Sequence, residues 1–135
     1  MTRKIKIIYW ISTLWLALGM ASTGLVQLLK MKAEGGASVE GITHLGYPVY
    51  FLTILGIWKL LGVIAVLIPR YPLVKEWAYA GFFFAMSGAI FSHVAVGDPV
   101  KELLPPLLLL VLTVLSWYFR PANRKPELKP QLSVA

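Results

Sequence analysis

The sequence predicts an all-α integral membrane protein, built as a four-helix bundle with both ends of the chain in the cytoplasm. Of its 135 residues, 58% are hydrophobic and only 14% are charged, and the mean hydropathy is +0.72. A soluble domain is about half apolar and about a quarter charged. A soluble fold could not cover its surface with so few polar side chains. The composition therefore excludes an ordinary soluble protein.

Four apolar runs are each long enough to cross a bilayer as a helix, which takes roughly 17–25 residues. These predicted spans are residues 7–29, 49–68, 77–97 and 103–119. Only Lys59 interrupts the second run, and His93 is the one side chain of the third run that titrates near neutral pH. Pro105 and Pro106 fall in the first turn of the fourth run, where a missing N–H donor does least harm. The membrane domain is thus expected to occupy residues 1–120.

The basic residues predict the orientation. With a cytoplasmic N-terminus, the inner segments hold nine Lys and Arg residues and the outer segments hold three, namely Lys30, Lys32 and Lys101. This distribution obeys the positive-inside rule, so the net charge of +7 indicates topology and argues against a nucleic-acid partner. The basic, proline-containing tail at 121–135 is expected to be disordered and attracted to anionic lipid.

A secretory signal peptide is the competing interpretation of the first run. Arg3, Lys4 and Lys6 would form its basic region, and residues 17–19 loosely resemble a cleavage site. The apolar run continues well beyond that point to Leu29, which favours an uncleaved signal-anchor helix.

Small residues recur along the third run at spacings of three and four, which places them on one helical stripe. The stripe consists of Ala78, Gly81, Ala85, Gly88, Ser92 and Ala95. Helices in lipid associate through close contact at small residues. We therefore expect the stripe to be a helix-packing seam and the third helix to be central, with the leucine-rich fourth helix peripheral.

Lys59 lies near the middle of the second run, where a lysine costs about 2.5–3.5 kcal/mol to insert. Gly56 and Gly62 flank it three residues away on either side, so a neighbouring helix can approach that face closely. Lys59 is expected to face the bundle interior, with no acidic residue at the same depth. It could serve a ligand, ion or proton site, or it could be a structural lysine held by hydroxyls and carbonyls or snorkelling to an interface.

Four polar residues are expected to converge at the outer end of the bundle, namely Gln27, His44, His93 and Asp98. Gln27 and His93 fall near the outer ends of the first and third runs, while His44 belongs to a glycine-rich loop. A few polar groups in an apolar wall are typical of a small-molecule site, although contact with lipid headgroups would also explain them. The His93 ring could transfer protons or bond a quinone carbonyl.

No resident cofactor can be identified from the sequence. The absence of cysteine excludes disulfides, thiolate zinc sites and iron–sulfur clusters. His44 and His93 show no recognised spacing for haem or a metal, so no metal site is predicted. Glu76 is expected to be structural, either favouring the positive start of the third helix or pairing with Arg70 or Lys75.

Several segments resemble the DoxX-like family of small bacterial membrane proteins. They are His44–Phe51, Leu55–Gly62, Lys75–Phe82, Ser92–His93 and Gly97–Asp98. The resemblance implies a four-helix bundle in the bacterial cytoplasmic membrane, but it assigns no reaction. Related proteins are linked with thiosulfate:quinone oxidoreductases and other membrane redox complexes. The similarly built vitamin K epoxide reductase-like bundles act through cysteines, so their chemistry does not transfer to this chain.

Two functions are therefore predicted. The first is a non-catalytic component of a larger membrane assembly, favoured because the chain has no redox-active cysteine and no cofactor ligand set. The second is a membrane subunit of a quinone-linked oxidoreductase, in which Lys59 and His93 contact the quinone. The expected partners are the lipid bilayer and other membrane or redox subunits.

Overall fold

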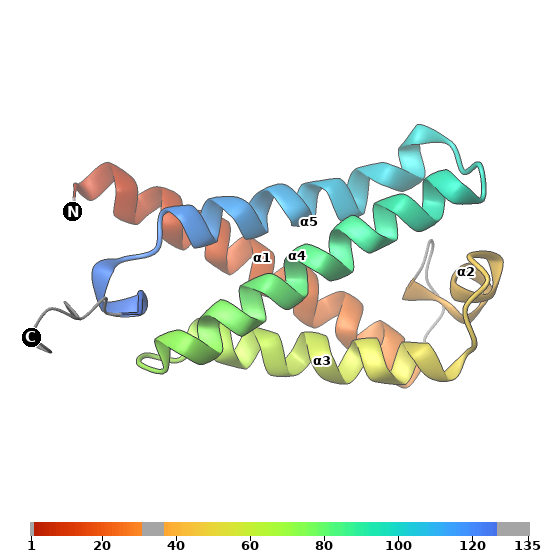
Figure 1. The fold of residues 1–135 in the computed structure, drawn as a ribbon, viewed down its shortest axis with the longest axis horizontal. Helices are drawn as coiled ribbons and strands as arrows, with labels where there is room; N and C mark the ends of the chain where they lie inside the picture. The colour runs from red at the N-terminus through yellow and green to blue at the C-terminus, as the bar shows by residue number, and fades with distance from the viewer. Residues whose placement is uncertain (1, 31–36, 127–135) are drawn as a thin grey trace, which may run out of the picture.

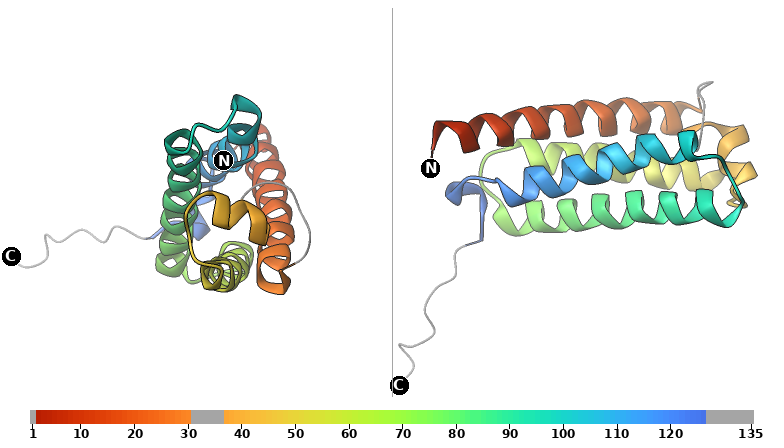
Figure 2. Two further views of the ribbon diagram at one scale, coloured as in Figure 1. Left: turned by 90° about the vertical axis from the view of Figure 1, so that its right-hand side faces the viewer. Right: turned by 90° about the horizontal axis from the view of Figure 1, so that it is seen from above.

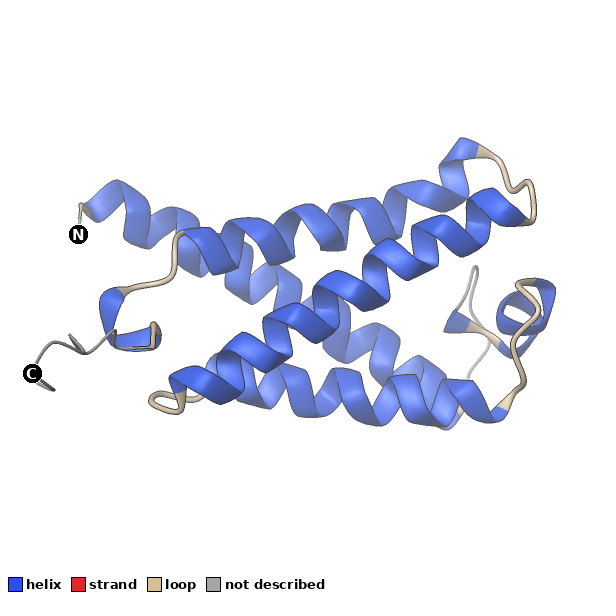
Figure 3. Cartoon of the chain, in the orientation of Figure 1, coloured by secondary structure: helices blue, strands red, loops and turns tan. Residues whose placement is uncertain are grey.

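The computed structural model describes residues 2–30 and 37–126, and that part of the chain contains helices and no strand (Figure 3). The elements are α1 (Arg3–Leu29), α2 (Val39–His44), α3 (Tyr50–Leu67), α4 (Pro72–Ala95), α5 (Val100–Tyr118) and the 3-10 helix η2 (Ala122–Arg124). By length and composition, α1, α3, α4 and α5 can each cross a membrane. The predicted all-α, four-span architecture is confirmed.

The four long helices form a ring in which each has two neighbours (Figures 1 and 2). Helix α1 packs against α3 and α5, and α4 packs against the same two helices from the opposite side. Helix α2 lies across one end of the bundle, next to α3. We call this end the α2 end, and we call the opposite end, which carries the start of α1 and η2, the terminal end. Because α4 and α5 occupy equivalent ring positions, the expected central third helix and peripheral fourth helix are not found.

The hydrophobic core fills the middle of the bundle and the half near the terminal end. All four long helices contribute to it, with Leu16, Ala17, Met20, Val63, Val66, Tyr79, Phe82, Met86 and Leu112 as its buried members. A hydroxyl network crosses this part of the bundle, because the Ser116 hydroxyl of α5 lies 2.5 Å from that of Thr13 and 2.8 Å from that of Tyr79. Buried polar groups paired in this way avoid the cost of unsatisfied hydrogen bonds.

Helices α1 and α3 are close enough for their backbones to touch, at glycines outside the predicted stripe. A Cβ atom at Gly56 would lie only 2.7 Å from the Gly24 carbonyl oxygen. On the stripe, by contrast, a Cβ at Gly81 or Gly88 would meet nothing within 4 Å, and both residues are exposed, as is Ala95. The expectation that the whole stripe is a packing seam within the chain is wrong. The large side chains on the neighbouring face of α4, among them Phe82, make the packing contacts instead.

Local capping explains where the helix limits differ from those predicted. Helix α4 starts five residues early because Tyr71 takes a left-handed conformation (φ 54°) and Pro72 supplies the preset φ of a first helical residue. The glycine-rich loop expected around His44 is instead the short helix α2. Its N-cap is Ser38, whose hydroxyl accepts the Gly41 N–H at 2.9 Å.

Part of the tail that was expected to be disordered is packed against the terminal end. Arg124 is buried, and its guanidinium donates to the Val66 carbonyl at 3.0 Å and lies over the Trp10 ring. The Lys75 ammonium donates to the Ala65 and Ile68 carbonyls. Two cations therefore satisfy the last carbonyls of α3, which lack helical partners. Residues 127–135 lie outside the described part of the chain.

Glu76 joins α4 to α5 rather than pairing with Arg70 or Lys75. One carboxylate oxygen lies 2.7 Å from the Arg120 guanidinium, and the other accepts the Trp117 indole N–H at 2.8 Å. Since α4 begins at Pro72, Glu76 stands in its second turn and does not cap it.

Candidate functional site

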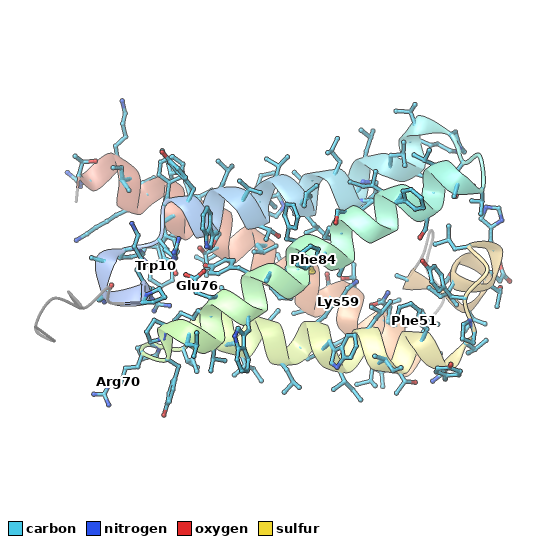
Figure 4. The ribbon with its side chains drawn as sticks, viewed as in Figure 1. Trp10, Phe51, Lys59, Arg70, Glu76 and Phe84 are labelled. Atoms are coloured by element: carbon cyan, nitrogen blue, oxygen red, sulfur yellow. The ribbon has the colours of Figure 1, made fainter. Side chains whose placement is uncertain are left out.

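A cavity of about 530 Å³ occupies the half of the bundle near the α2 end. Helices α3 and α4 diverge towards this end, and Lys59 lies between them (Figures 1 and 4). All four spanning helices and the α2 region contribute to the wall. Its polar members are Thr23, Gln27, Tyr47, Lys59, Ser92, His93, Lys101 and Glu102. The volume and the mixture of apolar wall and few polar groups are those of a small-molecule site.

The small residues of α4 help to create this space. Ala85, Gly88 and Ser92 border the cavity, with Phe51 and Leu55 among the α3 residues that border it. Large residues at these positions would fill the gap between the diverging helices. Part of the predicted stripe therefore forms a cavity wall rather than a seam between helices.

Lys59 is the buried cation of the cavity, with only 7% of its surface exposed. Its ammonium donates to the Thr23 hydroxyl at 3.2 Å, and within residues 2–30 and 37–126 it has no other hydrogen bond and no ion pair. An ammonium carries three donors, so this arrangement leaves donor capacity towards the cavity. The stem packs on α1, because a Cβ at Gly24 would lie 3.1 Å from the Lys59 Cβ. The interior orientation expected for Lys59 is thus observed.

Three residues from separate segments meet at the α2 end, and we call them the His–Asp–His cluster. Asp98 Oδ1 lies 2.6 Å from His44 Nε2, and Asp98 Oδ2 lies 2.6 Å from His93 Nδ1. The side chain of His44 is 56% exposed, whereas those of Asp98 and His93 are 11% and 7% exposed. The hydrogen bonds from His93 and His44 hold the pKa of the Asp98 carboxyl below its usual range. The cluster therefore runs from the exposed His44 to His93, which borders the cavity.

The end of α4 positions Asp98 against His93. Gly97 takes a positive φ of 78°, which a glycine adopts without strain. The Gly97 N–H then bonds the Val94 carbonyl at 3.1 Å and the Asp98 N–H bonds the His93 carbonyl at 2.9 Å. This pair of bonds is a Schellman motif. It turns the chain back so that the Asp98 carboxylate faces the His93 ring in the last turn of α4.

A second contact fixes the segment before α3 to α4. The Ser92 hydroxyl donates to the Gly88 carbonyl at 2.8 Å and lies 2.7 Å from the Tyr47 hydroxyl. Because the Ser92 proton is already used, Tyr47 donates in this pair. Tyr47 and Ser92 both border the cavity, so this bond helps to close its α2 end.

The structure brings together the four residues expected at the outer end, though in two layers. Gln27 and His93 border the cavity together with Lys59, while His44 and Asp98 lie behind His93. Glu102 also borders the cavity, although the apolar run that predicts the fourth helix begins only at residue 103. The signal available in the sequence was Pro99, a natural residue to precede a helix, followed by an acidic residue in the first turn. Among the described residues, no group of three or more His, Asp or Glu side chains is arranged to hold a metal ion.

Comparison with known proteins gives one match. Residues 11–116 match the model of the DoxX-like family, and this range contains every residue that borders the cavity as well as the His–Asp–His cluster. No curated protein and no solved structure matches the chain. The family match covers most of the sequence and all four spanning helices in whole or in large part. The chain belongs to the DoxX-like family.

Proposed function

We propose that this multi-pass membrane protein is a non-catalytic component of a membrane assembly and binds a small amphiphilic molecule in its cavity. The observation that carries the proposal is Lys59, a buried cation with one hydroxyl partner at the wall of a largely apolar space. An unpaired charge is costly to bury. A ligand that brings an acceptor oxygen to the ammonium would offset that cost.

The other residues that border the cavity restrict the kind of ligand that it can bind. Phe51, Leu55 and Leu109 supply apolar surface suited to a ring or a hydrocarbon chain. Thr23 and Ser92 also border the space, but their hydroxyl protons are donated to carbonyls of their own helices, which leaves Lys59 as the main donor for a ligand oxygen. The matching ligand has one oxygen-bearing head and an apolar body, and it fits within about 530 Å³.

A second candidate function is the membrane subunit of a quinone-linked oxidoreductase of the thiosulfate:quinone type. The observation that favours it is that Lys59 and His93 border the same cavity. Lys59 can donate to a quinone carbonyl, and the His93 ring can accept from the hydroxyl that forms when the other carbonyl is reduced. Electrons would come from a separate redox subunit, since the chain contains no cysteine.

The proposed location is the bacterial cytoplasmic membrane, with the terminal end in the cytoplasm and the α2 end outside. The excess of basic residues on the segments that join the terminal end supports this orientation. The His–Asp–His cluster then faces the outer aqueous phase.

The experiment that tests binding compares wild type with Lys59→Met and with the control Arg70→Gln, each purified in lipid nanodiscs. Arg70 is exposed at the terminal end, in the connection between α3 and α4, and it does not border the cavity. Mass spectrometry of the extracted small molecules should find an oxygen-bearing amphiphile with wild type and Arg70→Gln, and little of it with Lys59→Met. Titration with a short-chain ubiquinone addresses the second candidate. Equal ligand content in all three proteins would contradict a role for Lys59 in binding.

A further inference from the structure

His93 borders the cavity, and one of its two ring nitrogens is committed to a hydrogen bond. Nδ1 lies 2.6 Å from Asp98 Oδ2, and a carboxylate only accepts hydrogen bonds. Nδ1 therefore carries the proton, so in the neutral ring Nε2 carries a lone pair. Within the described residues, Nε2 has no hydrogen-bond partner. The ring borders the cavity and is buried, so a bound molecule meets a base whose tautomer is already set.

The cavity also contains a group that stabilises an anion. Lys59 borders the same space and retains donor capacity. The remaining ionisable groups that border the cavity are Tyr47, Lys101 and Glu102. Tyr47 is committed to Ser92, and the other two belong to the first turn of α5. His93 therefore remains as the candidate base, because its Nδ1 is hydrogen-bonded to the Asp98 carboxylate.

We propose that the cavity takes an amphiphile whose head is a weakly acidic hydroxyl, of the phenol or hydroquinone class, and that His93 accepts the hydroxyl proton while Lys59 holds the oxyanion. This inference rests on the proposed binding function and names the ligand class for it. In the step, the O–H bond of the ligand breaks and an N–H bond forms at Nε2. The resulting imidazolium lies against the Asp98 carboxylate, and the oxyanion lies against the Lys59 ammonium. No electron is transferred and the step is reversible.

Asp98 and His44 are positioning residues in this scheme. Asp98 fixes the ring tautomer and stabilises the imidazolium, as a carboxylate behind a histidine does in hydrolytic enzymes. His44 reaches Asp98 from α2 and holds the carboxylate from its second oxygen. The exposure of His44, at 56% of its side chain, places the cluster in contact with water, from which a proton can be exchanged after the ligand leaves.

The test uses two probes of matched shape, 4-nitrophenol and 4-nitroanisole, with the full chain in nanodiscs and empty nanodiscs as the blank. Only the first probe can ionise, and its anion is coloured. At a pH below the pKa of free 4-nitrophenol, wild type and Arg70→Gln should bind both probes and show the coloured anion. In His93→Gln the ratio of ionised to neutral bound probe should fall about tenfold, which is one pKa unit. Binding of 4-nitroanisole should remain, and Asp98→Asn should show a similar loss of ionisation.

Each other result has a defined meaning. If wild type binds neither probe, the proposed binding function fails, and this inference fails with it. If wild type binds both probes but 4-nitrophenol stays neutral, the inference is overturned and the binding function stands. If His93→Gln ionises the probe as wild type does, or if Glu102→Gln abolishes ionisation while His93→Gln retains it, His93 is not the base and the inference is overturned. A loss of 4-nitroanisole binding in His93→Gln would assign the ring a structural role and also overturn it.

Discussion

Lys59 of α3 and Gly24 of α1 are in direct backbone-to-stem contact, since a Cβ at Gly24 would lie 3.1 Å from that of Lys59. Any larger residue at Gly24 would push against the lysine stem or the Gly56 carbonyl oxygen, which lies 3.3 Å from the same point. The α1–α3 seam thereby fixes where the Lys59 chain leaves its helix. Its ammonium then reaches the hydroxyl of Thr23, the residue that precedes Gly24 on α1.

We expect Gly56→Ala to destabilise the bundle and Gly88→Ala to be tolerated. A Cβ at Gly56 would come within 2.7 Å of the Gly24 oxygen and 2.9 Å of the Leu28 backbone nitrogen, so two helices must move apart. Overpacking of this kind costs about 1–3 kcal/mol. A Cβ at Gly88 meets nothing within 4 Å. Melting temperatures in detergent measure the difference, and equal values for the two variants would contradict the α1–α3 seam.

Lys59→Met should raise the stability of the ligand-free protein while it removes ligand binding. Methionine fills a similar volume without a buried charge, and replacing buried ionic groups by apolar ones is often neutral or stabilising by about 1–4 kcal/mol. The free energy of unfolding in detergent, measured after the ligand is washed out, checks this. A clear loss of stability would show that Lys59 is a structural residue held by Thr23.

Asp98→Asn should lower stability at neutral pH and have little effect in acid. The pKa of Asp98 in the folded protein lies below its usual value because His93 and His44 bond its carboxylate. A lowered folded pKa gives stability that is present above the unfolded pKa, about 3.9 for Asp, and that is lost as the pH falls through the lowered value. Melting curves of wild type and variant between neutral and strongly acid pH should converge at the acid end. A constant difference at every pH would exclude ionised Asp98 as the cause.

Arg124→Ala should destabilise the terminal end, whereas Lys125→Ala should not. Arg124 is buried and bonds the Val66 and Leu67 carbonyls at the end of α3, while Lys125 is exposed. Hydrogen bonds to a charged group are worth about 1.5–3 kcal/mol. Thermal unfolding of the two variants provides the comparison. If both variants have the same melting temperature as wild type, the contact of this segment with α3 does not contribute to stability.

Single cysteines can test the proposed orientation, because the natural sequence contains none. Val100 at the α2 end and Tyr71 at the terminal end are both exposed. In intact cells, a membrane-impermeant maleimide should label Val100→Cys, and it should label Tyr71→Cys only after the membrane is disrupted. The reverse pattern would place the α2 end in the cytoplasm.

The spans could be predicted because crossing a bilayer imposes a length and a composition that are visible in the sequence. The convergence of His44, His93 and Asp98 was also predictable, since alternate crossings bring the ends of particular helices to one side. Which face of each helix packs against its neighbours was not predictable from composition alone. Gly88 has the sequence pattern of a packing glycine, yet α3 and α4 diverge towards the α2 end and Gly88 borders a cavity. Glu102 was missed because its position depends on the helix starting at Val100, a local capping event.

The two ends of the bundle differ mechanically. At the terminal end, Arg124 and Lys75 bind the last turn of α3, and the solid core lies directly above them. At the α2 end, the same helix borders the cavity, and the segment that precedes it contacts α4 through Tyr47 and Ser92. Because α3 and α4 are held together at the terminal end, a small tilt between them there produces a larger separation at the α2 end. Movement of α4 away from α3 at this end would widen the cavity for an incoming molecule, and it would break the Tyr47–Ser92 and His44–Asp98 contacts without disturbing the packed half of the protein.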